Sequence, residues 1–304
     1  MNVSVVVPTY SEERLPDLHE CVEALLAQTY DDVEVVIVVD GNQALADSIE
    51  EEYGTEEQVV IFNMAEERGP ISRANMGVVL ASGDIVALTD DDAVPSQDWV
   101  ETLVETYERH EDAIAVGGKM VPEWVVEDPG YIPEEFHFLI GVSHRGFPET
   151  EQEVRNTFGA NLSFKRDVYM KLGGIKQGGI DPSQIQGRET EFCARMRRTY
   201  GKGVIYNPDA VVSHKIFEYR TDKRWLLERA FWQGYSKRAM ATLVPDQSGN
   251  ESQFARDLFL RYFPDRVFDA LRGASDDVVP KFVMLVALTA AISVGYLWGV
   301  LRWR

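Results

Sequence analysis

The chain has 304 residues, 45% of them hydrophobic, and a formal net charge of −20. This length and apolar content suffice for one large domain, or two small ones, with a sizeable buried core. The strong negative charge argues against a nucleic-acid ligand, because phosphate backbones bind to basic surfaces.

Arginine is much more frequent than lysine among the basic residues, with 21 arginines and nine lysines. An excess of carboxylates with few lysines is typical of proteins from salt-loving archaea. At molar salt the Debye length falls to about 3 Å, so the like charges hardly repel one another. We therefore interpret the acidity as an adaptation to the solvent and not as a binding surface for a basic partner.

The two cysteines, Cys21 and Cys193, lie far apart in apolar segments. They are too few for a disulfide framework and wrongly spaced for a zinc site, so we expect buried free thiols, compatible with a reducing compartment. Residues 1–8 read directly as a strand, and we therefore expect no signal peptide.

Apolar strands and amphipathic helices alternate over the first 117 residues. Strands are predicted at 3–7, 33–39, 59–62, 84–88 and 113–117. Helices, with apolar residues at helical spacing, are predicted at 15–28, 44–53, 71–81 and 99–109. This alternation predicts a doubly wound α/β sheet, in which ligands bind beyond the carboxyl ends of the strands.

Three consecutive aspartates, Asp90, Asp91 and Asp92, follow the apolar strand at 84–88. Adjacent carboxylates repel one another, so a folded protein seldom places them at a strand end without a cation. A divalent ion with oxygen ligands, holding a diphosphate, is the interpretation that this pattern favours. The alternative is a solvated acidic turn.

Two more polar clusters are expected at the same edge of the sheet. Thr9 and Tyr10 follow the first strand, and Asp40 ends the second. Each cluster alone is a weak signal. Their shared placement beyond the carboxyl ends of neighbouring strands indicates one ligand that touches all three.

The second half of the chain becomes irregular after Gly117 and then regains its periodicity. A regular segment is predicted at 156–164, helices at 166–172 and 190–200, and a strand at 203–214. Residues 195–238 carry eleven Lys or Arg against four acidic residues, with tryptophan, phenylalanine and tyrosine interleaved. This mixture of basic and aromatic residues favours binding to a membrane surface that bears phosphates. The alternative is a solvated helix packed by its aromatic residues. Residues 252–271 are predicted as another amphipathic surface element.

The last segment is an uncharged run of 20 residues from Phe282 to Leu301. A helix of this length is about 30 Å long, enough to cross the hydrocarbon core of a bilayer. Orientation is open, because Arg302 and Arg304 at one end compete with Arg272 and Lys281 at the other under the positive-inside rule. A buried soluble helix, and a helix inserted in the plane of the membrane, are the alternatives.

The motifs, in their order along residues 3–214, resemble the family 2 nucleotide-sugar glycosyltransferases with the GT-A fold. The resembling segments are VSVVVPTY, VVIVVDG, GPISRANMGVVLASGDIVALTDDDAVPSQDW, GANLSFKRDVYMKLGGI and GRETEFCARMRRTYGKGVIYNPDAVVSH. The resemblance implies a Rossmann-like mixed α/β sheet, followed here by an amphipathic region and one transmembrane helix.

The resemblance also implies roles for residues at the sheet edge. Asp92 is expected to bind Mg²⁺ or Mn²⁺, with Asp90 on the metal or the ribose and His214 as a further metal contact. Nucleotide-binding residues are expected to be Pro8, Thr9, Tyr10, Asp40, Arg73, Asp90 and Asp91. The alternatives are a helix N-cap for Asp40, a surface position for Arg73 and a structural role for His214.

The general base is expected at Glu189. Relatives carry a Glu-Asp pair where this chain has Arg188 and Glu189, so Glu189 is the first candidate and Glu191 the second. Its alternative role is a first-turn carboxylate favoured by the helix dipole. Asn161 and Arg195 are expected to contact the acceptor or the diphosphate.

These expectations combine into one functional hypothesis. The resemblance implies an inverting, metal-dependent transfer of a hexose or hexuronic acid from a UDP- or GDP-sugar to a dolichol-phosphate-linked glycan. The composition and the carboxyl-terminal helix resemble the haloarchaeal Agl-type enzymes of S-layer protein N-glycosylation. A dolichyl-phosphate sugar synthase and a non-catalytic nucleotide-sugar-binding protein are the alternatives.

The same hypothesis assigns a place and an organisation to the chain. We expect it at the cell membrane with its catalytic domain in the cytoplasm. The expected regions are a nucleotide-sugar-binding half (1–116), an acceptor and catalytic-base half (117–218), an amphipathic membrane-surface region (219–279) and an anchor (280–304).

Overall fold

A computed structural model of the chain describes residues 1–176, 187–243, 254–272 and 277–303. The described residues form two compact units. Unit 1 contains Met1–Val121, residues 148–176 and Glu189–Lys215. Unit 2 contains Pro122–Phe147, residues 187–188 and the described chain from Ile216 onward. These units are defined by packing, and the four functional regions expected from the sequence stay predictions.

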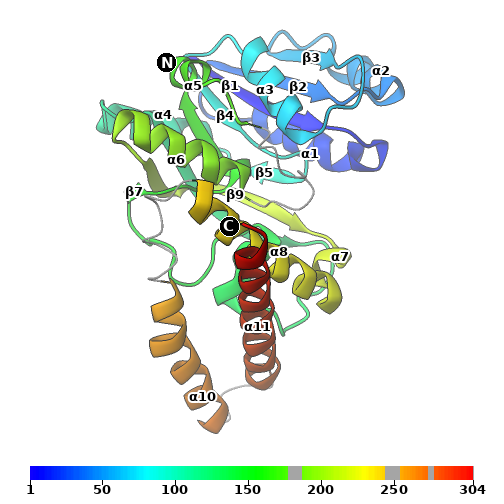
Figure 1. Cartoon of the computed structure of the whole chain (residues 1–304). Coiled ribbons are helices and arrows are strands. Elements are labelled where there is room, and N and C mark those ends of the chain that lie inside the picture. Colours follow the sequence, from blue (N-terminus) through cyan, green and yellow to red (C-terminus); the bar gives the residue numbers. More distant parts are fainter. Residues whose placement is uncertain (177–186, 244–253, 273–276, 304) are drawn as a thin grey trace. The chain divides into compact units, whose positions relative to one another are not determined.

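Unit 1 is built on a sheet whose first four strands are parallel (Figure 1). They are β1 (Val3–Thr9), β2 (Val33–Val39), β3 (Val59–Asn63) and β4 (Ile85–Leu88). Their order in space is β3-β2-β1-β4. β-Branched residues are frequent in β1, β2 and β4, which are buried on both faces, as the continuous apolar runs predict, whereas β3 at the edge is half-buried. These four strands and the helices predicted between them are confirmed to within a few residues at each boundary, whereas the strand predicted at 113–117 extends to Trp124.

Helices cover both faces of these strands. The unit 1 helices are α1 (Leu15–Leu26), α2 (Gln43–Tyr53), α3 (Pro70–Leu80), α4 (Trp99–Arg109), α5 (Arg166–Leu172) and α6 (Arg188–Tyr200). One core cluster joins α3, α5 and α6 to Val6, Val36 and Val86, which share one face of the sheet. Because side chains alternate along a strand, the opposite face is left for α1 and α2.

The sheet continues with antiparallel strands, so it is mixed. These strands are β5 (Ala93–Pro95), β6 (Ala115–Trp124), β7 (Gln152–Val154), β8 (Leu162–Lys165) and β9 (Val204–Ile216). β8 pairs with both β4 and β6, and β9 pairs with β5 and β7. A mixed α/β sheet confirms the expected fold class. The alternation of the first 117 residues carries no information on these later pairings, which connect distant segments.

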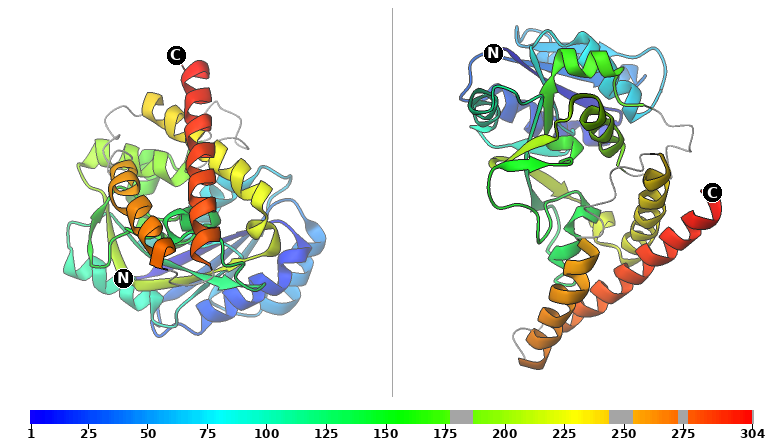
Figure 2. Two further views of the ribbon diagram at one scale, coloured as in Figure 1. Left: turned by 90° about the horizontal axis from the view of Figure 1, so that it is seen from below. Right: turned by 60° about the vertical axis from the view of Figure 1, so that its left-hand side comes forward.

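Unit 2 is mostly helical in its described part (Figure 2). Its elements are η2 (Glu134–Ile140), α7 (Glu218–Thr221), α8 (Lys223–Leu243), η5 (Leu258–Tyr262), α10 (Phe263–Arg272) and α11 (Val278–Arg302). The amphipathic element predicted at 252–271 starts just outside the described residues and includes η5 and α10. Of the described helices, α11 is the one long and apolar enough to cross a membrane by length and composition.

Candidate active site

The three aspartates lie in the turn that joins β4 to β5, where the backbone N–H of Ala93 donates to the carbonyl of Asp90 at 3.1 Å. Asp90 is exposed, whereas Asp91 and Asp92 are buried. A solvated turn would leave all three in water. Two of them instead face inward at the carboxyl edge of the sheet, where ligands of α/β proteins bind.

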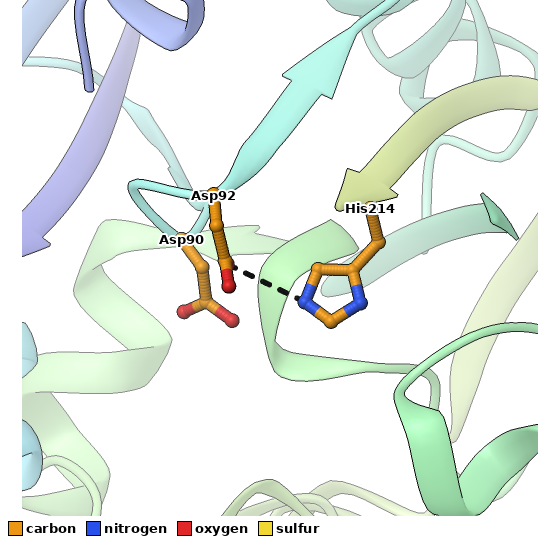
Figure 3. A group of neighbouring side chains, drawn as sticks. All are labelled: Asp90, Asp92 and His214. Atoms are coloured by element: carbon orange, nitrogen blue, oxygen red, sulfur yellow. Dashed lines mark ion pairs between the residues drawn. The ribbon is translucent and has the colours of Figure 1, made fainter. Parts of the chain in front are cut away.

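His214 reaches the same turn through the pairing of β5 with β9, which places Ala93 opposite His214. The His214 Nε2 atom lies 3.4 Å from a carboxylate oxygen of Asp92. One ligand atom each of Asp90, Asp92 and His214 lie within 4.8 Å of one another, and Figure 3 shows the side chains gathered at one point. Two carboxylates and an imidazole are a donor set that suits a divalent metal ion.

Two residues that the sequence does not mark, Arg14 and Lys215, also contact this turn. Arg14 donates to Asp92 at 2.9 Å from the segment after β1. The backbone N–H of Lys215 donates to the Asp92 carbonyl, while its ammonium group pairs with Asp17 and Glu20. No motif marks Arg14, because its approach to Asp92 depends on a tertiary contact across 78 residues.

Asp91 points back toward β1, where the Thr9 hydroxyl donates to it at 2.8 Å. Burial raises the pKa of Asp91 to about 6, although the hydrogen bond from Thr9 opposes that rise. Burial and the three aspartates also raise the pKa of Cys21, whose thiol donates to the Asp90 carbonyl at 3.6 Å. Cys21 and Cys193 are both buried and free, as expected.

Asp40 forms the second polar cluster, at the end of β2. Its carboxylate accepts hydrogen bonds from the backbone N–H groups of Arg68 and Gly69 at 2.8 and 3.0 Å. Arg73, one turn into α3, donates to Asp40 at 3.2 Å and stacks over the Tyr10 ring at 4.9 Å. The tight turn before α3 thus places the Arg73 guanidinium at the sheet edge.

Two of the alternatives for this cluster are wrong. Asn42, and not Asp40, caps α2, because its side chain accepts from the Leu45 N–H at 3.1 Å. Arg73 is not a surface residue, since it is only 7% exposed. Pro8 lies in β1 opposite Val38, directly before Thr9. Tyr10 is 51% exposed, and the Arg73 guanidinium lies over its ring.

Glu189 lies in the first turn of α6 and is half-buried. Its Oε2 atom lies 4.0 Å from the position that a Cβ atom of Gly159 would occupy. Gly159 belongs to η3 (Gly159–Asn161), which leads into β8 opposite the end of β4. Glu189 therefore lies at the same edge of the sheet as the aspartates.

Three other candidates are used inside the fold. Arg195 donates to both carboxylate oxygens of Glu191 at 2.8 and 2.9 Å, and to the carbonyls of Leu172 and Gly174. The Asn161 amide donates to two backbone carbonyls and accepts from Trp99. All three side chains are thus engaged within the fold, and their contacts with a ligand, like the role of Glu191 as the second candidate base, stay predictions.

A family model described as "Glycosyl transferase family 2" matches residues 4–173, which is more than half of the chain. The chain is a member of glycosyl transferase family 2. Over 303 residues it is 46% identical to a glucosyl-dolichyl phosphate glucuronosyltransferase of Haloferax volcanii, covering 99% of this chain and 97% of that protein. Glycosyltransferase AglE of the same organism is 33% identical over 206 residues, which cover 67% of this chain and 65% of AglE.

Two solved structures share the fold of this family 2 member. A mannosyltransferase of Pyrobaculum calidifontis, in complex with GDP-Man and Mn²⁺, aligns over 98% of this chain and 87% of its own with a TM-score of 0.65 at 19% identity. TarS of S. aureus, in complex with UDP, aligns over 97% and 89% with a TM-score of 0.54 at 15% identity. The GT-A-type fold and the glycosyltransferase activity expected from the sequence are thereby confirmed.

The geometry and the family agree on what the sheet edge can do. Two proteins of the same fold have been solved with GDP-Man and Mn²⁺, and with UDP. Asp90, Asp92 and His214 form a donor set that fits a divalent cation. Asp40, Arg73 and Tyr10 form a separate polar and aromatic cluster at the same edge.

Proposed function

We propose that this glycosyltransferase transfers glucuronic acid from a UDP- or GDP-linked donor to a dolichyl-phosphate-linked sugar. The observation that carries the proposal is the similarity to the Haloferax glucosyl-dolichyl phosphate glucuronosyltransferase. The two sequences are 46% identical over 97% of the length of the Haloferax protein. The context that we propose is haloarchaeal S-layer N-glycosylation at the cytoplasmic face of the cell membrane.

The donor diphosphate is proposed to bind at the sheet edge. A Mg²⁺ or Mn²⁺ ion held by Asp90, Asp92 and His214 would neutralise charge on the leaving diphosphate. Asp40 and Arg73 would orient the base and ribose, with Tyr10 stacked on the base. Their support is geometric: the Asp40 and Arg73 side chains are buried and hydrogen-bonded to each other, so both are already ordered.

Glu189 is proposed as the general base of an inverting displacement. It would accept the proton of the acceptor hydroxyl as that oxygen bonds to the anomeric carbon and the bond to the diphosphate breaks. Its support is its position at the aspartate edge and the pairing of its rival Glu191 with Arg195.

The test is a product analysis with purified enzyme and defined lipids. UDP- and GDP-linked glucuronate, and the corresponding glucose donors, are each combined with glucosyl-dolichyl phosphate or bare dolichyl phosphate. We expect a glucuronosylated product only with a glucuronate donor and the glucosylated lipid. Transfer to bare dolichyl phosphate would instead identify a sugar-phosphate synthase. Absence of nucleotide release with every pair would favour a non-catalytic binding protein.

A further inference from the structure

Helix α11 is buried on one side along its whole length. At 3.6 residues per turn its buried residues fall on one helical face: Val278, Met284, Leu285, Leu288, Gly295 and Gly299. The large apolar residues that remain exposed occupy the rest of the surface: Val279, Val283, Val286, Val294, Tyr296, Leu297, Trp298, Val300 and Leu301. A helix that crosses a bilayer alone has no reason to be divided in this way.

Helix α8 covers the carboxyl half of the buried face, and Figure 2 shows the two helices crossing. At the crossing the backbones almost touch. A Cβ atom on Gly234 would lie 1.9 Å from the Ile292 carbonyl oxygen, and one on Gly295 would lie 1.9 Å from that of Phe231. Farther along, Arg238 donates to the Trp303 carbonyl at 3.2 Å. The contact is therefore an integral part of unit 2.

Charged groups cover the beginning of the same face. Lys281 pairs with Glu134 of η2 at 2.7 Å. Glu134 also pairs with Arg266 of α10, which binds the fully buried Glu135 at 3.0 Å. A spanning α11 would carry these groups and α8 toward the hydrocarbon, where charged side chains are costly. The packing therefore opposes a transmembrane orientation.

A second apolar stripe lies on the neighbouring segment. Leu260, Val267, Phe268 and Leu271 are exposed at helical spacing on η5 and α10. Phe263 of α10 contacts Phe282 of α11 with ring centroids 6.2 Å apart, so the two helices belong to one surface. A single spanning helix does not explain this second stripe.

The charges beside the stripes have a small positive excess. The described residues 254–272 and 277–303 carry six basic side chains against four acidic ones, Asp257, Asp265, Asp269 and Asp277. The charged residues of these ranges in the exposed class are arginines: Arg256, Arg261, Arg272 and Arg302. Arg272 stacks over Phe268 at 3.9 Å, and Arg302 stacks over Trp298 at 5.2 Å. In a chain of net charge −20, this selection fits the anionic headgroups of a lipid surface.

We infer that α10 and α11 bind an anionic bilayer in the plane of its surface, and that α11 does not span it. The apolar stripes enter the boundary between headgroups and acyl chains, and the arginines contact the lipid phosphates. This inference goes beyond the proposed reaction and does not depend on the donor or the acceptor.

The first experiment determines the topology of α11. Full-length protein is added to sealed vesicles of phosphatidylglycerol and phosphatidylcholine, and Arg272→Cys and Arg302→Cys are labelled with a membrane-impermeant maleimide. These residues flank the two ends of α11, so an in-plane helix leaves both on the outer side. We expect equal labelling before and after the vesicles are opened by detergent. Labelling of one site only after opening would show a spanning helix and overturn the inference. The wild-type chain, whose two cysteines are buried, gives the background.

The second experiment tests the surface itself by vesicle co-sedimentation. Val286→Glu and Val294→Glu place a charge in the exposed stripe of α11, and each is expected to weaken binding about tenfold, equivalent to about 1.4 kcal/mol. Val79→Glu on α3 is the matched control, because Val79 is 52% exposed, between Val286 at 44% and Val294 at 57%. Equal binding by all three variants, or binding that ignores phosphatidylglycerol, would overturn the inference. Neither result bears on the proposed transfer of glucuronate.

Discussion

The sheet edge of unit 1 and the helices α10 and α11 of unit 2 have opposite surface chemistry. At the sheet edge carboxylates are drawn together and partly buried, with Arg14 and His214 placed against Asp92. On α10 and α11 apolar side chains are left in solvent, and the charged residues of these helices in the exposed class are arginines. One region is organised for a cation and the other for an anionic surface. A very acidic chain thus keeps its two binding regions distinct by local charge and not by its net charge.

This comparison implies that chemistry and membrane attachment can be lost separately. A substitution at the sheet edge should leave vesicle binding unchanged, and one on α11 should leave the acidic cluster unchanged.

Asp92→Asn is expected to have the largest effect, because it removes a charged metal donor that also contacts Arg14 and His214. We expect turnover to fall by at least about a hundredfold, the lower end of the range for losing a catalytic group. Vesicle binding should not change. Asp84→Asn is the matched control, since Asp84 is exposed at the opposite end of the same strand. Near-normal turnover of Asp92→Asn with added Mn²⁺ would contradict the proposed metal site.

Glu189→Gln should follow, with a loss of about a hundredfold in turnover at saturating donor. The amide keeps the size of the side chain but cannot accept the proton. The concentration of donor at half-maximal rate should stay within about twofold of the wild type, as expected when a change acts only in the transition state. The same change at Glu191 separates the two candidates, because its main consequence should be a lower melting temperature through loss of the Arg195 pair. A larger loss of turnover at Glu191 would reverse the assignment.

Local sequence patterns predict the strands and helices of unit 1 well, whereas contacts between distant segments are not predictable from them. In unit 1 the apolar runs and helical periodicity follow local rules, so β1 to β4 and their helices were predicted close to their observed bounds. The position of the aspartate turn is predicted too, because it directly follows the apolar run of β4. The approach of Arg14 to Asp92, and the β5–β9 pairing that delivers His214, depend on tertiary contacts that no local pattern encodes. His214 could be proposed only by resemblance, and Arg14 was missed.

For the carboxyl-terminal helix the sequence predicts the element but not its surroundings. Its apolar length was read correctly, and residues 278–302 do form one helix. Hydropathy, however, does not distinguish an apolar side chain that faces lipid from one that packs on protein. Gly234 of α8 and Gly295 of α11 indicate packing on protein, because the absence of their side chains permits the two helices to cross closely. The spacing of Gly295 and Gly299 was an available signal that the sequence analysis did not use.

Gly295→Val tests the integrity of unit 2. Any side chain at this position meets the Phe231 carbonyl, so α8 and α11 have to separate. We expect a loss of about 1–3 kcal/mol in unfolding free energy, the usual effect of overpacking, measured by thermal unfolding in detergent. Ala290→Val is the control, because Ala290 is exposed on the same helix. Equal melting temperatures for the two variants would show that the crossing is not required. Metal-dependent binding of the nucleotide to unit 1 should be the same in both.

His214→Gln should have the smallest effect of the four and decides between the two roles of this residue. His214 is 4% exposed, and glutamine fills a similar volume. If the imidazole binds the metal, its loss removes one donor of the trio while both carboxylates remain. The Mn²⁺ concentration for half-maximal activity should then rise about tenfold, equivalent to about 1.4 kcal/mol, while the melting temperature without metal stays close to that of the wild type. His110→Gln is the control, since His110 pairs with Glu151 in the same unit but away from the aspartate turn. A lower melting temperature with an unchanged Mn²⁺ requirement would instead assign His214 to holding β9 against the turn, and the metal would then rest on carboxylates alone.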